Sequence, residues 1–451
     1  MIIKNFNELA RSRLWVDALS IIEEGLIRAD PINAIKNNVR VYGKTICFRD
    51  LCINLEKCVH VVGFGKASYK MLEGILKVLG LDRVCGGVII THNPEWVGRK
   101  GPVEIVLGDH PIPKMNTLKA SRRLLSYLKE GVSRDDLVVT LISGGGSALF
   151  ENPMPPITMD DLSTLNDLLL KSGADIGEIN TVRKHVSQVK GGRLAKIIYP
   201  ARLVSLIISD VVGDPIDVIA SGPTAPDPTT FRDAYQVLKR RGLWERVPES
   251  IRMVINNGLK GNIEESPKPG DKVFTKVHNI IIASNILSLR AMAEKAKSLG
   301  YNPVILTSMM EGEARDVAKF LAGIVKHVLS YGWVKDRPLA ILLGGETTVT
   351  VKGKGIGGRN QELALAFSIY AKGLKDVVLA SIGSDGRDGI SDAAGAIVDG
   401  NTYYEAEKAG LDPIEFLERN DSYTILSKLG CTIYTGPTGT NVNDLAVILI
   451  R

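Results

Sequence analysis

The stretch Gly344–Ala366 carries the first combination of residues in this chain that could do chemistry. It follows the apolar run Pro338–Leu343, which predicts a buried strand, and it is rich in glycine as far as Gly358. Glycine permits positive φ and lets backbone approach a ligand closely. We expect four residues of this stretch to bind a ligand: Gly344, Gly345, Glu346 and Arg359.

Arg359 stands immediately before a predicted helix, Asn360–Tyr370, whose apolar residues have helical spacing. Backbone N–H groups at the start of a helix favour an anion, and a neighbouring guanidinium adds to that preference. The alternative is a β-hairpin in which Thr347–Val351 returns through Gly353–Gly358, with ordinary solvated cations. Similar loops elsewhere in the chain favour a ligand site over this alternative.

A second glycine loop surrounds Lys66. The predicted strand Val59–Val62 leads into a loop with Gly65 and then Lys66, near the start of a helix where a lysine could meet a phosphate or a carboxylate. The loop does not complete the dinucleotide fingerprint GxGxxG, because the third glycine is replaced by Ser68. A P-loop is also excluded, since Asn38 stands where that motif needs glycine. A solvated lysine after a tight turn remains the alternative.

A third loop follows the predicted strand Leu137–Ile142 and allows close backbone contact with a ligand. Its residues are Ser143, Gly144, Gly145, Gly146 and Ser147. The spacing does not form the GxSxG turn of a serine hydrolase, which makes that enzyme class a weak interpretation.

A basic segment, Asn180–Arg193, ends in two glycines. We expect it to supply further contacts to an anion through Arg183, Lys190 and Arg193, although a basic helix face is usually only solvated. Two aspartates, Asp210 and Asp385, follow predicted strands in glycine-containing loops. Carboxylate oxygens in such loops suit Mg²⁺ that also carries phosphates, and the alternative is that these aspartates cap helices.

Short apolar strands alternate with helical segments along the whole chain, which predicts an α/β fold with mostly parallel sheets. The predicted strands are Val59–Val62, Gly87–Ile90, Leu137–Ile142, Leu203–Ile208, Ile280–Ala283, Val304–Leu306, Leu339–Leu343 and Val377–Ile382. In such sheets ligands bind at the carboxyl ends of the strands, where all the loops above must gather.

The length of 451 residues predicts two domains, which we place at 1–240 and 241–451, within a polar region poor in strands. The net charge of +6 is mild and no long run of cations occurs, so a nucleic-acid partner is not expected. The five cysteines show no metal-binding spacing and are expected to be reduced, buried thiols. No signal peptide or membrane-length apolar run is evident, which predicts a cytoplasmic protein.

Eight ordered sequence blocks resemble type 2 glycerate kinases, whose C-terminal part is the MOFRL domain. The blocks are GFGKAS (63–68), DHPIP (109–113), SGGGSAL (143–149), NTVRKHVSQVKGGRLA (180–195), SDVVGDPIDVIASGPT (209–224), GGETTVTVKGKGIGGRNQELALA (344–366), GSDGRDGISDAAGA (383–396) and TGPTGTNVNDL (435–445). They extend over nearly the whole chain. The resemblance implies a Rossmann-like α/β/α N-terminal domain, a C-terminal α/β domain and an active site in the cleft between them.

The resemblance also implies ATP-dependent phosphorylation of D-glycerate to 2-phosphoglycerate with Mg²⁺, and active-site roles for Lys66 and Arg359. We expect these two cations to hold the glycerate carboxylate or the transferring phosphate. As unpaired surface cations, they should contribute little to stability. Asp210 and Asp385 would bind Mg²⁺ or orient the hydroxyl. The alternatives are an NAD(P)H-dependent hydroxypyruvate reductase and a sugar-acid- or nucleotide-sensing binding protein. A homodimer is possible.

Overall fold

The computed structural model describes residues 1–332 and 336–451, and the chain forms two compact units. The central unit contains residues 34–282, and the terminal unit combines residues 1–33 with 283–451. This division differs from the predicted one between residues 240 and 241. The central unit continues to Ile282 because strand β10 (Val277–Ala283) joins its sheet, and the N-terminal segment packs with the C-terminal half of the chain.

The central unit is built around a seven-stranded sheet in the order β10-β9-β8-β4-β5-β7-β6. Its other strands are β4 Val59–Phe64, β5 Val84–Thr91, β6 Gly98–Lys100, β7 Val103–Leu107, β8 Leu137–Ile142 and β9 Arg202–Ile208. Strands β4, β5, β7, β8 and β9 run parallel and β6 is antiparallel to β7, which confirms the mostly parallel sheet. Every residue of β8 is buried, as expected of a parallel strand covered on both faces.

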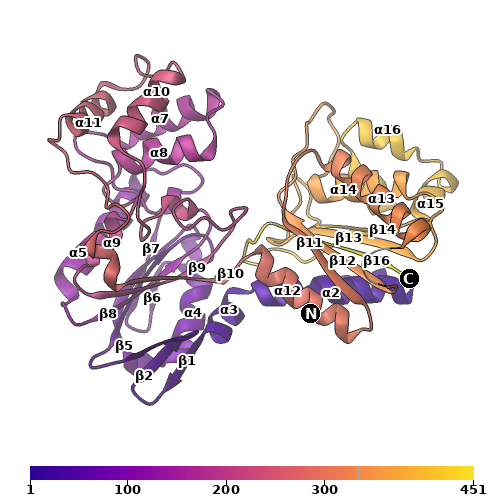
Figure 1. Ribbon diagram of the computed structural model, residues 1–451, viewed down its shortest axis with the longest axis horizontal. Helices are drawn as coiled ribbons and strands as arrows, with labels where there is room; N and C mark the ends of the chain where they lie inside the picture. The colour runs from indigo at the N-terminus through magenta and orange to yellow at the C-terminus, as the bar shows by residue number, and fades with distance from the viewer. Residues whose placement is uncertain (333–335) are drawn as a thin grey trace. The chain divides into compact units, whose positions relative to one another are not determined.

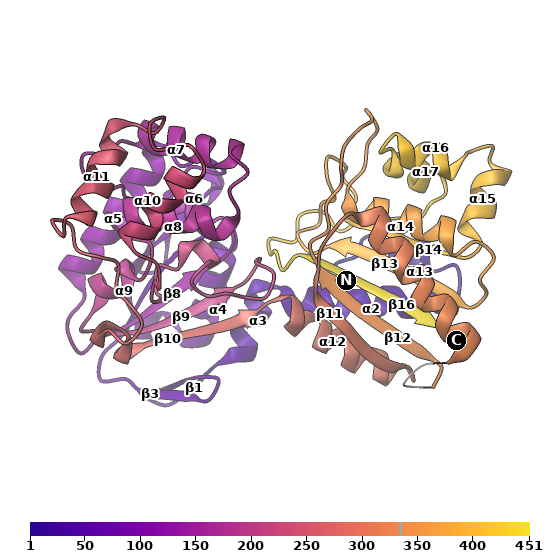
Figure 2. The ribbon, with the colours of Figure 1, turned by 45° about the horizontal axis from the view of Figure 1, so that its top comes forward.

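Helices cover this sheet and form a further layer beyond it. Helix α3 Pro31–Asn38 begins in the terminal unit and enters the central one at Ala34. The other helices of the central unit are α4 Ser68–Leu79, α5 Met115–Gly131, α6 Gly146–Leu149, α7 Met159–Lys171, α8 Ile176–Val186, α9 Arg193–Ile198, α10 Phe231–Arg240 and α11 Glu249–Leu259. Apolar residues of α5 and α9 pack on the sheet in one core cluster, and α7, α8, α10 and α11 share a second cluster. These four helices gather at one end of the unit (Figure 2).

A small antiparallel sheet is formed by β1 Val39–Tyr42, β2 Thr45–Phe48 and β3 Leu51–Asn54. Helix α4 packs against β1 of this sheet and against β4, β5 and β8 of the large one. Because α4 directly follows the Lys66 loop, its packing fixes where that loop ends, and β4 fixes where it begins.

The terminal unit contains a six-stranded sheet in the order β11-β12-β16-β13-β14-β15. The strands are β11 Asn302–Met310, β12 Leu339–Gly345, β13 Val377–Gly383, β14 Gly395–Asp399, β15 Thr432–Ile433 and β16 Asp444–Ile450. Among the described strands of this unit, only β11 and β12 pair in parallel; β16 inserts between β12 and β13 and is antiparallel to both. The prediction of mostly parallel sheets is therefore wrong for this unit, because the last strand of the chain returns through the middle of the sheet.

Helices lie on both faces of the terminal sheet. They are α1 Phe6–Leu9, α2 Arg13–Ala29, α12 Asn285–Ser298, α13 Ala314–Tyr331, α14 Arg359–Tyr370, α15 Thr402–Lys408, α16 Pro413–Glu418 and α17 Ser422–Lys428. Figure 1 shows α2 and α12 on one face and α13 and α14 on the other. The N-terminal helix α2 approaches α12 closely at Gly25, where a Cβ would lie 2.8 Å from the sulfur of Met292. This packing explains why the first residues belong to this unit.

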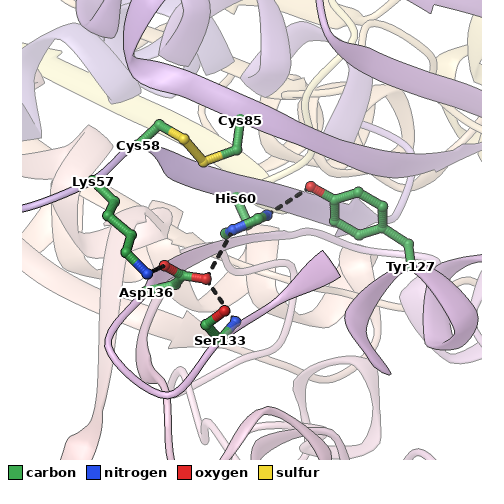
Figure 3. The surroundings of a disulfide bond; sticks show 7 residues. All are labelled: Lys57, Cys58, His60, Cys85, Tyr127, Ser133 and Asp136. Atoms are coloured by element: carbon green, nitrogen blue, oxygen red, sulfur yellow. Dashed lines mark hydrogen bonds and ion pairs between the residues drawn. A yellow bond between two sulfur atoms is a disulfide. The ribbon is translucent and has the colours of Figure 1, made fainter. Parts of the chain in front are cut away.

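Four of the five cysteines are paired in the structure, contrary to the expected reduced thiols, whereas Cys431 is a free, buried thiol as expected. Cys47 and Cys52 are direct partners across the β2–β3 hairpin, and their Cα atoms are 4.0 Å apart. Cys58 and Cys85 join the starts of β4 and β5 with a Cα separation of 5.2 Å (Figure 3). The β4–β5 register shifts between Val59 and His60, which leaves Cys85 without a ladder partner. Strand register of this kind could not be read from the cysteine spacing.

Replacing Cys58 with serine is expected to lower the free energy of unfolding by about 3 kcal/mol, because the lost bond closes a long loop of the unfolded chain. The two cysteines are 27 residues apart and enclose β4, the Lys66 loop and α4. Urea unfolding with and without a reductant measures the effect, and the reduced wild type should match the reduced variant. The Cys47→Ser variant removes a disulfide between residues only 5 positions apart, so it should lose less free energy of unfolding. A wild type whose stability does not respond to reductant would contradict the pairing.

Candidate functional site

The Lys66 loop and the SGGGS loop meet at the carboxyl ends of β4 and β8. The backbone N–H of Lys66 donates to the carbonyl of Gly144 at 2.9 Å, and the N–H of Ala67 donates to Ser143 Oγ at 3.0 Å. Gly65 has a φ of +115°, and a Cβ there would overlap the Ser143 side chain. The structure thus brings together two loops that the sequence predicted separately.

Three further groups surround the glycines of the SGGGS loop. A Cβ at Gly144 would overlap the carboxylate of Asp210, which follows β9. Gly145 has a φ of +76°, and a Cβ there would lie 3.0 Å from His110 Nε2 and 3.2 Å from Lys66 Cγ. Side chains larger than hydrogen would displace these groups, so the glycines are required by the packing of Lys66, His110 and Asp210 around them.

Ser147 belongs to an internal chain of polar groups. Its hydroxyl lies 2.9 Å from Ser221 Oγ, which donates to Asn180 Oδ1 at 2.9 Å. This chain of hydrogen bonds joins the SGGGS loop to Ser221 and to Asn180 of α8.

A cavity of about 470 Å³ opens beside these loops in the central unit. The polar residues that line it include His110, Gly145, Ser147, Glu151, Asn166, Arg183 and Lys190. Arg183 is half-buried, and its Nε donates to Asn166 Oδ1 at 2.7 Å. Two of the three cations expected from the basic segment therefore line this cavity.

Lys190 does not have the role that its sequence neighbourhood predicted. Only 1% of this residue is exposed, and its ammonium group donates to the carbonyls of Ser147 at 2.8 Å and Phe150 at 3.0 Å. It also forms an ion pair with Glu151 at 2.9 Å. An ammonium has three N–H donors, and these contacts use all of them. Lys190 therefore holds the segment after the SGGGS loop in place, and it has no donor left for a substrate anion.

Arg193 also has an internal partner. It begins α9, and its Nη2 donates to the carbonyl of Glu264 at 3.2 Å. It is not among the residues that line the cavity described above. Its role as an anion contact stays a prediction.

Lys66 is exposed and forms no ion pair with any residue that the structure describes. Its charge is felt by His110, where burial, Lys66 and His92 together lower the pKa to about 4. The imidazole is therefore neutral at physiological pH.

Replacing Lys66 with methionine is expected to raise the pKa of His110 towards its ordinary value, because a positive charge beside the ring disfavours imidazolium. Burial, the largest cause, remains, so the pKa should rise without reaching that ordinary value. Titration of the His110 ring by NMR measures the shift, and Lys119→Met on α5 serves as a charge-matched control. An unchanged titration in Lys66→Met would contradict the proximity of the two groups.

In the terminal unit Arg359 has internal partners, contrary to the expected unpaired cation. Its Nε lies 2.7 Å from Asp444 Oδ2 and its Nη2 donates to Asp444 Oδ1 at 3.0 Å, while its Nη1 contacts Glu346 at 2.7 Å. Burial raises the pKa of Asp444 to about 7, and the contacts from Arg359 and Asn360 oppose that rise. Glu346 therefore orients the arginine, and only part of the guanidinium surface is open to a ligand.

The start of α14 is occupied by a carboxylate of the chain itself. Asp388 accepts hydrogen bonds from the backbone N–H groups of Asn360 at 3.1 Å and Gln361 at 2.8 Å. Burial raises the pKa of Asp388, and these donors oppose the rise. The helix start was predicted to favour a bound anion; the structure fills it with Asp388, which acts as the helix cap.

The segment between β12 and α14 is an irregular loop, without the β-hairpin of the alternative interpretation. It is anchored by Asn420, whose side-chain oxygen accepts from the N–H groups of Lys352 and Gly353 at 2.8 and 2.9 Å. Gly344 and Gly345 lie where a Cβ would overlap Asn285 and the backbone of Met310. Their glycine identity is explained by this packing alone, and contact with a ligand stays a prediction for them.

A cavity of about 710 Å³ lies under this loop in the terminal unit. Arg359 and Asp385 both line it, together with Arg387 and Asp388. Asp385 Oδ1 accepts from the backbone N–H of Arg387 at 3.1 Å, so the carboxylate also shapes the turn after β13. The terminal cavity therefore has a candidate cation and a candidate carboxylate in its lining.

Comparison with known proteins identifies the family. Residues 17–256 match the model of a domain of unknown function, DUF4147, and residues 339–444 match the MOFRL family. The chain is 43% identical over 433 residues to a glycerate 2-kinase of Pyrococcus horikoshii, with 96% of each chain covered. It is 42% identical to a D-glycerate 2-kinase of Thermotoga maritima, covering 96% of this chain and 97% of the relative. The chain belongs to the glycerate 2-kinase family.

The fold is shared with solved members of this family. A crystal structure of glycerate kinase from Thermotoga maritima matches with a TM-score of 0.86 at 41% identity, covering 96% of this chain and 98% of the other. The family resemblance inferred from the sequence blocks and the two-domain α/β fold are thereby confirmed.

Sequence reasoning missed three residues of these sites: His110, Glu151 and Asp444. His110 and Asp444 lie within the family blocks DHPIP and TGPTGTNVNDL. These blocks indicated the family but did not assign either residue a role. Glu151 lies outside every block, and only the structure shows that it pairs with Lys190.

Within residues 1–332 and 336–451, no cluster of three or more metal-ligating side chains occurs. This is compatible with Mg²⁺, which usually takes one or two protein carboxylates together with phosphates and waters. Asp210 beside the SGGGS loop and Asp385 in the terminal cavity each offer one carboxylate. In the same described residues, no helix is long and apolar enough to cross a membrane.

Proposed function

We propose that this chain transfers the γ-phosphoryl group of ATP to the 2-hydroxyl of D-glycerate. The observation that carries the proposal is Lys66, an exposed cation without an ion-pair partner among the described residues, set in a site of glycine backbone. The names of the relatives in Pyrococcus horikoshii and Thermotoga maritima supply the reaction. A cytoplasmic location and a homodimer remain predictions from the sequence.

The chemistry of phosphoryl transfer suits this kind of site. The reaction needs positioning and charge stabilisation far more than covalent participation by the protein. Lys66 and Arg359 would contact the glycerate carboxylate or the transferring phosphate, and Arg183 would add a contact in the central cavity. Backbone groups of Gly65 and of the SGGGS loop would bind phosphate oxygens at close range.

The test is incubation of the full chain with ATP, Mg²⁺ and D-glycerate, followed by identification of the product. Formation of 2-phosphoglycerate is the expected result. Formation of 3-phosphoglycerate would correct the position of transfer. No phosphorylated product, together with NADH- or NADPH-dependent reduction of hydroxypyruvate, would replace the kinase with a reductase.

Mg²⁺ would supply charge neutralisation of the phosphates when it is bound, and Asp210 and Asp385 are the carboxylates proposed to hold it or to orient the hydroxyl. We expect turnover to stop in excess chelator and to return when Mg²⁺ is added back. Asp210→Asn and Asp385→Asn should each lower kcat strongly, with little change in the thermal unfolding temperature. Asp392→Asn provides a control from the same GSDGRDGISD segment. Full turnover in chelator, or wild-type rates in both variants, would contradict a metal role.

A further inference from the structure

The cavity of the central unit contains a histidine to which none of the roles above is assigned. His110 follows β7 and lines the cavity beside Gly145. Its Nε2 and the Cγ of Lys66 would lie 3.0 and 3.2 Å from a Cβ at Gly145. The imidazole and the stem of the candidate cation therefore flank the same glycine. Any substrate group held by Lys66 would arrive next to this ring.

The two ring nitrogens of His110 make no hydrogen bond to any residue within the described part of the chain. The buried histidines of the same unit differ in this respect. His60 contacts Tyr127 at 2.7 Å and Asp136 at 3.3 Å, as Figure 3 shows. His185 contacts the carbonyl of Thr181 at 2.7 Å and Glu265 at 3.1 Å. Those two rings have structural partners, whereas the nitrogens of His110 are available to a ligand.

The backbone that carries His110 is held firmly by its neighbour Asp109. The N–H of Asp109 donates to Thr117 Oγ1 at 2.9 Å, and its carboxylate accepts from the N–H of Thr117 at 3.0 Å. Thr117 in turn donates to the carbonyl of Ala148, at the end of the SGGGS segment, at 3.1 Å. The hydrogen bonds of Asp109 thus fix the position of His110 relative to the glycine loop that it faces.

We propose that His110 is a catalytic residue that accepts the proton of the attacking glycerate hydroxyl. This role rests on the proposed function. A bond forms between the hydroxyl oxygen and the γ-phosphorus while the bond from that phosphorus to the β–γ bridging oxygen breaks. The electron pair of the broken bond leaves with ADP. The hydroxyl proton moves to a ring nitrogen of His110, which becomes imidazolium and later returns the proton to water.

The charges around the ring keep it in the neutral form that can accept a proton. Burial lowers its pKa most, and Lys66, from the loop after β4, and His92, from the loop after β5, lower it further. The other ionisable groups that line the cavity are Glu151, Asp167, Arg183 and Lys190. An anionic substrate bound at Lys66 would offset the repulsion from that cation, so His110 should accept a proton more readily in the complex than in the free protein.

The other candidate bases near this ring, Glu151 of the cavity wall and Asp210 beside the SGGGS loop, are already engaged. Glu151 pairs with Lys190 and accepts from Ser187 Oγ at 2.6 Å. Asp210 is packed against Gly144 and has a partner of its own. These contacts favour His110 over the two carboxylates as the proton acceptor.

The experiment compares His110→Ala and His110→Gln with the wild type in the full chain, with ATP, Mg²⁺ and D-glycerate. Loss of a general base predicts a fall in kcat of about 10²- to 10³-fold, with a much smaller change in KM for glycerate. The acid limb of the kcat/KM profile should disappear in both variants and persist in Asp210→Asn. Added imidazole should restore part of the activity of His110→Ala. Because only a folded protein can be rescued in this way, the rescue also shows that the variant is folded. His327→Gln, an exposed histidine on α13, should behave as the wild type.

Each result decides one question. An active wild type with His110 variants at the wild-type rate would overturn this role and leave the proposed function intact. A fall in rate with an unchanged pH profile and no imidazole rescue would assign His110 a structural role and also overturn the inference. A wild type that forms no phosphoglycerate would overturn the proposed function, and the role of His110 with it.

Discussion

Replacing Lys190 with methionine is expected to lower the free energy of unfolding by about 3–5 kcal/mol, the cost of leaving a buried charge without its partner. The variant leaves the Glu151 carboxylate without its counter-ion, and it removes the donor to the carbonyls of Ser147 and Phe150. Methionine fills a similar volume, so the loss should come from these polar groups. Urea unfolding followed by circular dichroism measures the change.

A second variant distinguishes the charge effect from general damage to the core. Glu151→Gln in the Lys190→Met background removes the unpaired charge and should recover part of the lost stability. Lys196→Met provides a matched control, because Lys196 pairs with Glu264 at the surface and its loss should cost at most about 1 kcal/mol. Equal losses in Lys190→Met and Lys196→Met would contradict the importance of the buried pair.

The buried strands of this protein, and the loops that follow them, could be predicted from sequence patterns. Continuous apolar runs such as Leu137–Ile142 predicted buried strands, and the structure confirms them because parallel strands covered on both faces need such runs. The loops after those strands could be expected to gather, since strand ends of one sheet lie along one edge. The meeting of the Lys66 and SGGGS loops follows from that topology.

Sequence reasoning failed where the outcome depended on pairing across long separations. Arg359 and Lys190 looked alike as cations beside glycines, yet each is held by a carboxylate that sequence spacing does not identify: Asp444 for the first, Glu151 for the second. The position of β16 in the middle of the terminal sheet, and the packing of α2 with α12, depend on the same long-range contacts. Glycine patterns were equally ambiguous. Gly344 and Gly345 allow close packing within the protein, and in sequence such glycines look the same as those of a ligand-binding loop.

Replacing Arg359 with alanine is expected to lower kcat/KM. The loss of transition-state stabilisation should be about 2–4 kcal/mol, the scale of losing one charge-stabilising donor in an active site. Lysine should not restore the activity, because it cannot contact Asp444 through two nitrogens while also meeting Glu346 and a substrate. Steady-state kinetics with ATP and D-glycerate measures both variants. Lys372→Ala, which removes an exposed pair with Glu407 in the same unit, should retain the wild-type rate.

Arg359→Ala is also expected to destabilise the protein, in contrast to the prediction made from an unpaired cation. The pKa of Asp444 is about 7 in the folded chain, above its ordinary value, and loss of Arg359 should raise it further. A carboxyl group with a raised folded-state pKa binds more protons when folded, so its contribution to stability falls as pH rises from its ordinary pKa to the folded-state pKa. This fall ends near pH 7 in the wild type and at a higher pH in the variant, so the variant should lose stability relative to the wild type above about pH 7. Near pH 5 the carboxyl carries its proton in wild type and variant alike, and the difference should be smallest there.

The double variant Arg359→Ala with Asp444→Asn separates the two effects of the arginine. Asparagine has no charge to leave unpaired, so stability above neutral pH should return towards the wild-type value. Activity should remain low, because the group that contacts the substrate is still missing. Recovery of kcat/KM together with stability would show that Arg359 acts only by neutralising Asp444, and would remove it from the proposed substrate site.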